Sequence, residues 1–241
     1  MNKIKTKEIL KKAIGSAFLM VSALAVLSPG VNAKDLKSPE KEVVSDSIFN
    51  ARNIFEKIQA SALEILPSST RLDMIDYWDA DSVYKASNAM DGLSWLEAVT
   101  PDYLKVRITS VSELEIKILP EKKGRIAMTV YTVGDDVQAQ DSQVKFYDEN
   151  LLELPTDKFL VMPEVKDFFD IPKGSATKMK EIEEMIPFPT IAFSASPDND
   201  SLEARLTVSQ YINQDDWNIA KLFVKPYVTL QWKKDKFKVE K

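Results

Sequence analysis

The chain has 241 residues, of which 44% are hydrophobic and 29% are charged, and its formal net charge is −5. This length and composition are ordinary for a folded protein with one large domain or two small ones. The sequence contains neither histidine nor cysteine. Disulfides, thiolate nucleophiles, histidine-based triads, Cys/His zinc sites and an acylated lipoprotein cysteine are therefore excluded. Its few glycines form no phosphate-binding loop, so no cofactor is predicted.

The first 33 residues have the pattern of a secretory signal peptide. Five lysines and one glutamate occupy residues 3–12, an apolar segment follows over residues 13–27, and small residues lead to Ala33. This order predicts export to the periplasm or the extracellular space, with cleavage after Ala33. An uncleaved N-terminal anchor is the alternative. The apolar segment is shorter than the roughly 20 residues of a membrane span, and no transmembrane segment is expected after cleavage.

The expected mature chain is more acidic than the whole, because residues 1–33 carry more lysines than acids. Nucleic-acid binding needs a basic surface, so no nucleic-acid partner is predicted. Residues 34–46 are charged and lack an apolar period, which predicts a flexible lead-in. Residues 47–241 are predicted to form a single α+β domain.

Two helices are predicted at the start of this domain. Apolar residues recur at spacings of three and four over residues 48–65, after a cap at Ser45 or Ser47. Pro67 ends this helix, and a second one starts at residues 68–70, with Thr70 as its cap. Its predicted buried side is formed by Leu72, Ile75 and Tyr77 or Trp78. Residues 88–92 read as a loop, followed by a short turn around Trp95 and Leu96.

From Tyr103 onward the apolar period changes from 3.6 to 2. Alternating residues predict strands at 103–109, 114–118, 126–130 and 144–146, with one face of the sheet in water. A proline-punctuated connector over 151–187 carries short helices at 165–169 and 177–185. Strands return at 190–194, 202–208, 228–232 and 237–239. The prediction is N-terminal helices packed on a mostly antiparallel sheet, either continuous or divided into halves 47–150 and 188–241.

The segment from Ala51 to Pro120 resembles a known family. It holds the stretch RLDMIDY at 71–77, then TPDYL at 100–104 and EIKILP at 115–120. These stretches resemble domain of unknown function 3256, a family of secreted proteins of Gram-negative, gut-type bacteria. The resemblance extends more loosely to the C-terminus. It implies export and a domain that covers nearly all of the mature chain, and it implies no activity and no catalytic residues.

An aspartate cluster on the second predicted helix is the first candidate site. Asp73 and Asp76 lie three residues apart and share a helix face, which Asp79 extends, and Asp81 follows at the helix end. Several carboxylates together could bind Ca²⁺, which takes oxygen ligands. The alternative is a solvated face near the helix N-terminus, with Arg71 pairing one of the carboxylates in a structural network.

A second candidate site is centred on Trp217. This tryptophan follows Asp215 and Asp216 in the polar segment 213–217, which reads as a loop, and an exposed tryptophan there could contact a ligand such as a glycan. A glycosidase with two carboxylates is one hydrolase class that needs neither histidine nor cysteine. The other tryptophans are interpreted as packing residues, with Trp232 on the apolar side of its strand.

The absence of histidine and cysteine lowers the expectation of catalysis without forbidding it. The sequence therefore favours a non-enzymatic envelope protein that acts through binding or assembly, with another envelope protein or a glycan as its partner. Two alternatives stay open, a carboxylate-based glycan hydrolase and a carrier of an apolar ligand. For a carrier, the residues that would line an enclosed cavity, or else simply fill the core, are Met128, Phe146, Phe193, Leu206 and Trp232.

Overall fold

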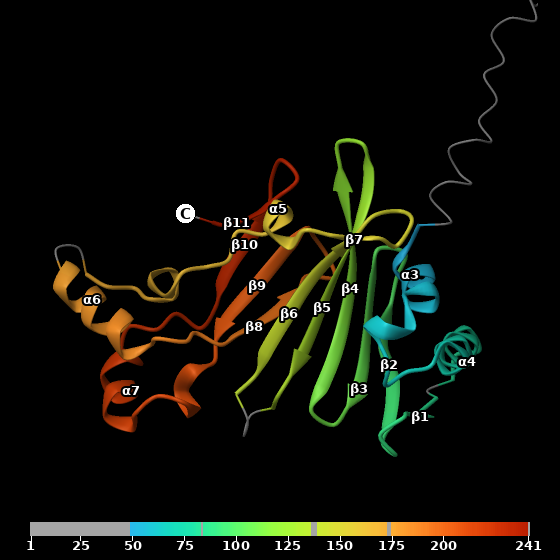
Figure 1. Cartoon of the computed structure of the whole chain (residues 1–241), viewed down its shortest axis with the longest axis horizontal. Coiled ribbons are helices and arrows are strands. Elements are labelled where there is room, and N and C mark those ends of the chain that lie inside the picture. Colours follow the sequence, from blue (N-terminus) through green and yellow to red (C-terminus); the bar gives the residue numbers. More distant parts are fainter. Residues whose placement is uncertain (1–48, 83, 136–138, 173–174, 241) are drawn as a thin grey trace, which may run out of the picture. The chain divides into compact units, whose positions relative to one another are not determined.

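The computed structural model of the chain describes residues 49–82, 84–135, 139–172 and 175–240 (Figure 1). The predicted signal peptide (1–33), the predicted lead-in (34–46) and the proposed caps Ser45 and Ser47 lie outside the described residues. The described residues from Phe49 onward belong to one compact unit. None of the helices in these ranges is both long and apolar enough to cross a membrane.

The first described helix is shorter than the apolar period predicted. Helix α3 (Ala51–Lys57) starts after Asn50, whose side chain accepts the backbone N–H of Asn53 at 2.8 Å. It ends at Ile58, whose ψ angle of 140° is extended, and a 3₁₀ turn η1 (Ala60–Ala62) follows. The predicted single helix over 48–65 is therefore wrong. Of its predicted apolar face, Ala51, Phe55 and Ile58 are buried, whereas Ala62 is exposed and Ile65 is half-buried.

Helix α4 (Ser68–Asp79) packs on α3 through a face that keeps the predicted Ile75 and, half-buried, Trp78, but not Leu72. It begins at Ser68, two residues before the proposed cap Thr70, with no side-chain cap at its start. Its buried residues are Arg71, Met74 and Ile75, whereas Leu72 is 47% exposed. The face is shifted because the Arg71 guanidinium turns inward, donating to the carbonyl oxygens of Phe55 at 2.6 Å and Ile58 at 3.0 Å.

The predicted antiparallel architecture is confirmed as two separate sheets. The first has seven strands in sequential order, β1-β2-β3-β4-β5-β6-β7, and every neighbouring pair is antiparallel. Its strands are β1 (Ala86–Ser87), β2 (Leu93–Val99), β3 (Tyr103–Thr109), β4 (Ser112–Glu121), β5 (Gly124–Val133), β6 (Asp141–Tyr147) and β7 (Glu153–Leu154). The turn predicted around Trp95 and Leu96 is wrong, because both residues lie within β2. Ser94 occupies a buried position there, and this small polar residue hid the alternation.

The second sheet has four strands in the order β11-β10-β9-β8. Short helices connect it to the first sheet, as predicted for the connector over 151–187. The elements of this half are α5 (Thr156–Phe159), η2 (Val165–Phe168), α6 (Ala176–Met185), β8 (Ile191–Ala195), β9 (Ser201–Leu206), η3 (Val208–Gln210), α7 (Gln214–Ala220), β10 (Val228–Trp232) and β11 (Phe237–Val239). In Figure 1, α3 and α4 lie beside β2–β4, and β8 and β9 lie beside β5 and β6.

Each face of the seven-stranded sheet contributes to its own hydrophobic core. On the helix-bearing face, Leu104, Ile116 and Ile118 pack against α3 and α4. On the opposite face, Met128 and Phe146 pack with the second sheet and the connector. The residues considered as cavity-lining, Met128, Phe146, Phe193, Leu206 and Trp232, all lie in or against this second core. These contacts favour the interpretation that the five residues fill the core.

Part of the face predicted to be in water is buried. Glu115 and Lys117 alternate with apolar residues on β4, and the side chain of each is only 2% exposed. The second sheet covers them, because β8 packs on β4–β6. The alternation on β4 was therefore correct, whereas the inference of a wet face was wrong at these two residues.

Candidate functional site

An apolar groove of about 660 Å³ opens at one end of the seven-stranded sheet. There the β1–β2 loop faces the turn between β3 and β4 and the end of β5. We call this space the apolar groove; its apolar lining residues are Ile65, Met90, Leu93, Trp95, Tyr131, Val111 and Val133. Met90 is 65% exposed, Leu93 50% and Val133 45%. Large apolar side chains that remain in water together often mark a binding surface.

The loop that carries Met90 is fixed by a single buried side chain. Asn88 is 7% exposed, and its carbonyl oxygen accepts the backbone N–H groups of Met90 and Gly92, both at 3.0 Å. Its amide nitrogen donates to Ser94 Oγ at 3.1 Å and to the Ile108 carbonyl at 2.9 Å. Two of these bonds anchor Asn88 to β2 and β3 and the other two hold the backbone of the loop, so the exposure of Met90 is built into the fold.

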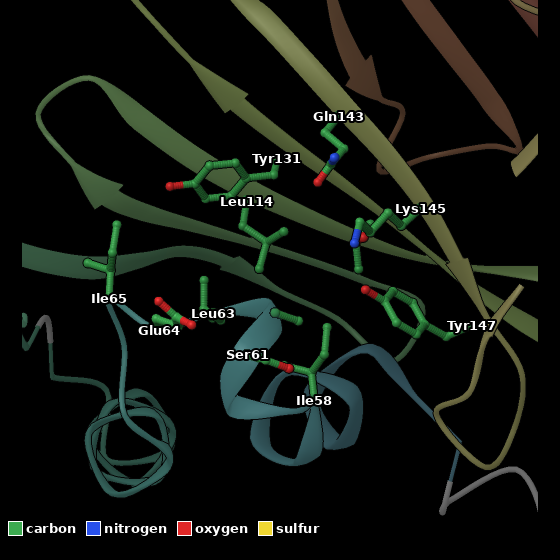
Figure 2. Close-up of a pocket in the computed structure, with 12 residues that line it drawn as sticks. Ile58, Ser61, Leu63, Glu64, Ile65, Leu114, Tyr131, Gln143, Lys145 and Tyr147 are labelled. Carbon is green, nitrogen blue, oxygen red and sulfur yellow. The ribbon is translucent and has the colours of Figure 1, made fainter.

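A second space, of about 290 Å³, continues from the groove along the helix-bearing face (Figure 2). Ile65 and Tyr131 line both spaces, so the two lie next to each other. We call the second space the polar compartment, because Gln143, Lys145 and Tyr147 of β6 line one side of it. The segment 58–65 forms the other side. Figure 2 shows Lys145 and Tyr147 on the strand side, and Glu64 beside Leu63 and Ile65 on the segment side.

Lys145 and Tyr147 are electrostatically coupled. The Lys145 ammonium lies 3.0 Å from a Glu153 carboxylate oxygen, and this hydrogen bond raises the pKa of Lys145. Burial raises the pKa of Tyr147, and the nearby Lys145 charge opposes that shift. Tyr147 therefore presents a neutral hydroxyl beside a cation, a pair that can donate hydrogen bonds to an anionic group.

A separate polar cleft, of about 300 Å³, lies where the two sheets meet. Glu113 and Glu203 both line it, the arrangement that a two-carboxylate hydrolase would need. Glu113, however, accepts ion pairs from Lys105 at 3.0 Å and from Arg107 at 2.7 Å. A carboxylate held by two cations at these distances suits a structural ion-pair network better than a catalytic role.

The structure does not bring the candidate metal ligands together. Asp73, Asp76 and Asp79 lie on exposed positions of α4, and Asp79 pairs with Arg52 at 2.8 Å. Among the described residues, no three acidic side chains are grouped closely enough to hold a metal ion. Arg71 does not join these carboxylates, because it caps the end of α3 instead.

The structure places Trp217, Asp215 and Asp216 on helix α7, which corrects the loop predicted there. Asn213 caps this helix by accepting the Asp215 N–H at 2.8 Å, and the two aspartates occupy its first turn, where acids are favoured. Trp217 is half-buried against the core between the sheets. The groove residues were missed because Met90 lies in a segment assigned to a loop, and its exposure follows from Asn88 rather than from any pattern.

Fold and groove together define an α+β protein of two antiparallel sheets with an open apolar groove at one end of the larger sheet. The chain belongs to the family described as "Protein of unknown function (DUF3256)", whose profile matches residues 44–237. A solved domain of an uncharacterized protein from Porphyromonas gingivalis W83 has a similar fold, with a TM-score of 0.65 at 23% identity. That match covers 78% of this chain and 96% of the other. No protein with a curated description matches the sequence.

Proposed function

We propose that this chain is an exported, non-enzymatic protein of the bacterial envelope that binds an apolar ligand in the apolar groove. The observation that carries the proposal is the exposure of Met90, Leu93 and Val133 around one space of about 660 Å³. Binding sites for small molecules span about 300–1,000 Å³ and are mostly apolar with a few polar groups. Export is supported by the basic and apolar order of residues 3–33.

The position of the groove favours this function over the two alternatives, a carrier with an enclosed cavity and a glycan hydrolase. A carrier cavity between the sheets is less well supported, because its proposed lining residues Met128 and Phe146 pack with other buried residues of one hydrophobic core. A glycan hydrolase would use the polar cleft, where Glu113 is held by two cations. Binding in the apolar groove requires no catalytic group, because transfer of apolar surface out of water is sufficient to drive it.

The test is a titration of the mature protein with an uncharged apolar fluorophore, 1-N-phenylnaphthylamine, whose emission rises in apolar surroundings. We expect saturable binding that Val133→Gln weakens at least fivefold. Val161→Gln is the matched control, because Val161 is 44% exposed, like Val133 at 45%, and does not line the groove. Equal effects of the two changes, or no saturable binding, would refute the proposal.

A separate assay addresses the hydrolase. The mature protein is incubated with purified cell-wall glycan and with soluble polysaccharides, and new reducing ends are measured. We expect none above the rate seen with heat-inactivated protein. Release that is lost in Glu113→Gln, with the folded state retained, would replace binding by catalysis as the function.

A further inference from the structure

We propose that the ligand is a single-chain amphiphile with an anionic head, whose apolar chain lies in the apolar groove and whose head binds Lys145 and Tyr147 in the polar compartment. This inference rests on the proposed function and names the class of its ligand. The chemistry shared by a carboxylate and a phosphate head is a compact anion with several hydrogen-bond acceptors.

Continuity of the two spaces is the first support. Ile65 and Tyr131 line both the apolar groove and the polar compartment, so the two spaces adjoin at these two side chains. Thr129, Tyr131 and Val133 alternate along β5, which places their side chains on one face of the strand. A ligand that follows β5 therefore passes from polar to apolar surroundings along an extended path.

The polar end has the donors that an anion needs. Gln143, Lys145 and Tyr147 alternate on β6 and all line the compartment, so an ammonium, an amide and a phenol project from one strand face. Lys145 carries three N–H donors, and in the described ranges its one ion pair is with Glu153 at 3.0 Å. Its side chain is 30% exposed, which leaves it accessible to a ligand.

The acids near the compartment do not cancel this preference. Glu153 is 54% exposed and does not line the compartment. Glu64 lies on the opposite side, in the segment that also carries Leu63 and Ile65 (Figure 2). Lys145 is the one cation among the residues that line either space. A head of negative charge is therefore directed to β6 rather than to the segment 58–65.

The experiment compares ligands of equal chain length and different heads. Dodecanoate, dodecyl phosphate, dodecan-1-ol and dodecyltrimethylammonium each displace the bound fluorophore below their aggregation concentrations. We expect both anions to bind at least tenfold tighter than the alcohol and the cation to bind weakest. A preference for dodecanoate over dodecyl phosphate, or the reverse, identifies which anionic source the site fits.

Matched variants assign the preference to Lys145. Lys145→Gln is expected to reduce the ratio of anion to alcohol affinity to about one, and Lys145→Arg to restore it. Lys178→Gln is the control, because Lys178 is 33% exposed and pairs with Glu181 at 3.1 Å, much as Lys145 pairs with Glu153. Equal ratios in the wild type and Lys145→Gln would overturn the inference.

The two proposals fail in distinguishable ways. Each methylene added to the chain should tighten binding about fourfold if the chain is buried in the groove. Dependence on chain length without any dependence on the head would overturn the amphiphile inference and leave the proposed function in place. If the wild-type protein unfolds cooperatively and yet binds none of the four ligands, both the proposed function and the amphiphile inference are overturned.

Discussion

The carboxylate of Glu115 accepts the backbone N–H of Ala195 at 2.8 Å, joining residues 80 positions apart in the chain. Two further groups of the first sheet do the same along β8. Ser142 Oγ accepts the N–H of Phe193 at 2.9 Å, and Asp141 accepts that of Ile191 at 3.3 Å. Alternate N–H groups of this edge strand are thus satisfied by side chains of the other sheet, which protects an edge that could otherwise pair with another chain.

Removal of the Glu115 side chain should destabilise the protein. Glu115→Ala leaves the Ala195 N–H and the Tyr103 hydroxyl, which donates to Glu115 at 2.7 Å, without their acceptor. We expect the free energy of unfolding to fall by about 3 kcal/mol, the cost of buried unpaired donors. Glu97→Ala is the control, because Glu97 is 28% exposed with one ion pair and should cost about 1 kcal/mol or less. Equal losses in urea denaturation would contradict this reading.

The same carboxylate predicts a direction for the pH dependence of stability. Burial raises the pKa of Glu115 above its ordinary value, against the opposing hydrogen bonds and the Lys105 charge 3.6 Å away. Between the ordinary value, about 4.3, and the raised one, the native state binds more protons than the unfolded state. The contribution of Glu115 to the free energy of unfolding therefore falls as pH rises through this window.

Comparison with Glu115→Gln isolates that contribution. The free energy of unfolding of the wild type minus that of Glu115→Gln should decrease from pH 4 upward and then level off. Denaturant titrations at several pH values measure it, with Glu97→Gln as a reference for exposed carboxylates. A difference that grows with pH would show that the native state holds Glu115 with a lowered pKa.

Arg71 is predicted to be a structural cation. Its side chain is 1% exposed and caps two carbonyl oxygens at the end of α3, and in the part of the chain that the structure describes it forms no salt bridge. Burial lowers the pKa of Arg71 accordingly. Arg71→Met should reduce the free energy of unfolding by about 2 kcal/mol or more, because buried carbonyls lose their donors. Arg52→Met, at a 37% exposed arginine, should cost less than about 1 kcal/mol.

Trp217 should contribute to stability rather than to ligand binding. It packs against the core between the sheets, whereas Ile219 on the same helix is 39% exposed. Trp217→Ala is expected to reduce the free energy of unfolding by about 2 kcal/mol, less than a fully buried aromatic residue would. Ile219→Ala should have a smaller effect, and neither change should alter the affinity for dodecanoate. A loss of affinity in Trp217→Ala alone would restore the interpretation of Trp217 as a contact residue.

Removal of the acid that competes for Lys145 should strengthen binding of an anion. Glu153→Gln removes the carboxylate 3.0 Å from the Lys145 ammonium and leaves that cation to the ligand. We expect dodecanoate to bind about threefold tighter or more, with little change for dodecan-1-ol, and the gain to shrink in high salt. Glu181→Gln, beside the control lysine Lys178, should change neither affinity. Tighter binding of both ligands would point to a general opening of the compartment.

The alternation of apolar residues on β3, β4 and β5, with short turns between them, was sufficient to predict these strands and their antiparallel pairing. A side-chain period of two is a local property of a strand and does not depend on which element packs against it. The charged helix predicted at 177–185 in the connector is likewise present, as α6. Helix α3 was predicted too long, since its end depends on Arg71 reaching two carbonyls from the next helix. Strand β2 was missed because Ser94 occupies a buried position that the pattern reserves for an apolar residue.

The sequence by itself determined the chemistry that this protein lacks, the class of its fold and the alternation on each long strand. Only the tertiary structure decided which alternating residues meet water, because Glu115 and Lys117 are covered by a sheet formed by residues far along the chain. The same holds for the groove. Met90 and Leu93 come from the β1–β2 loop and the start of β2, whereas Val133 ends β5, and the loop that brings them around one groove is anchored by Asn88.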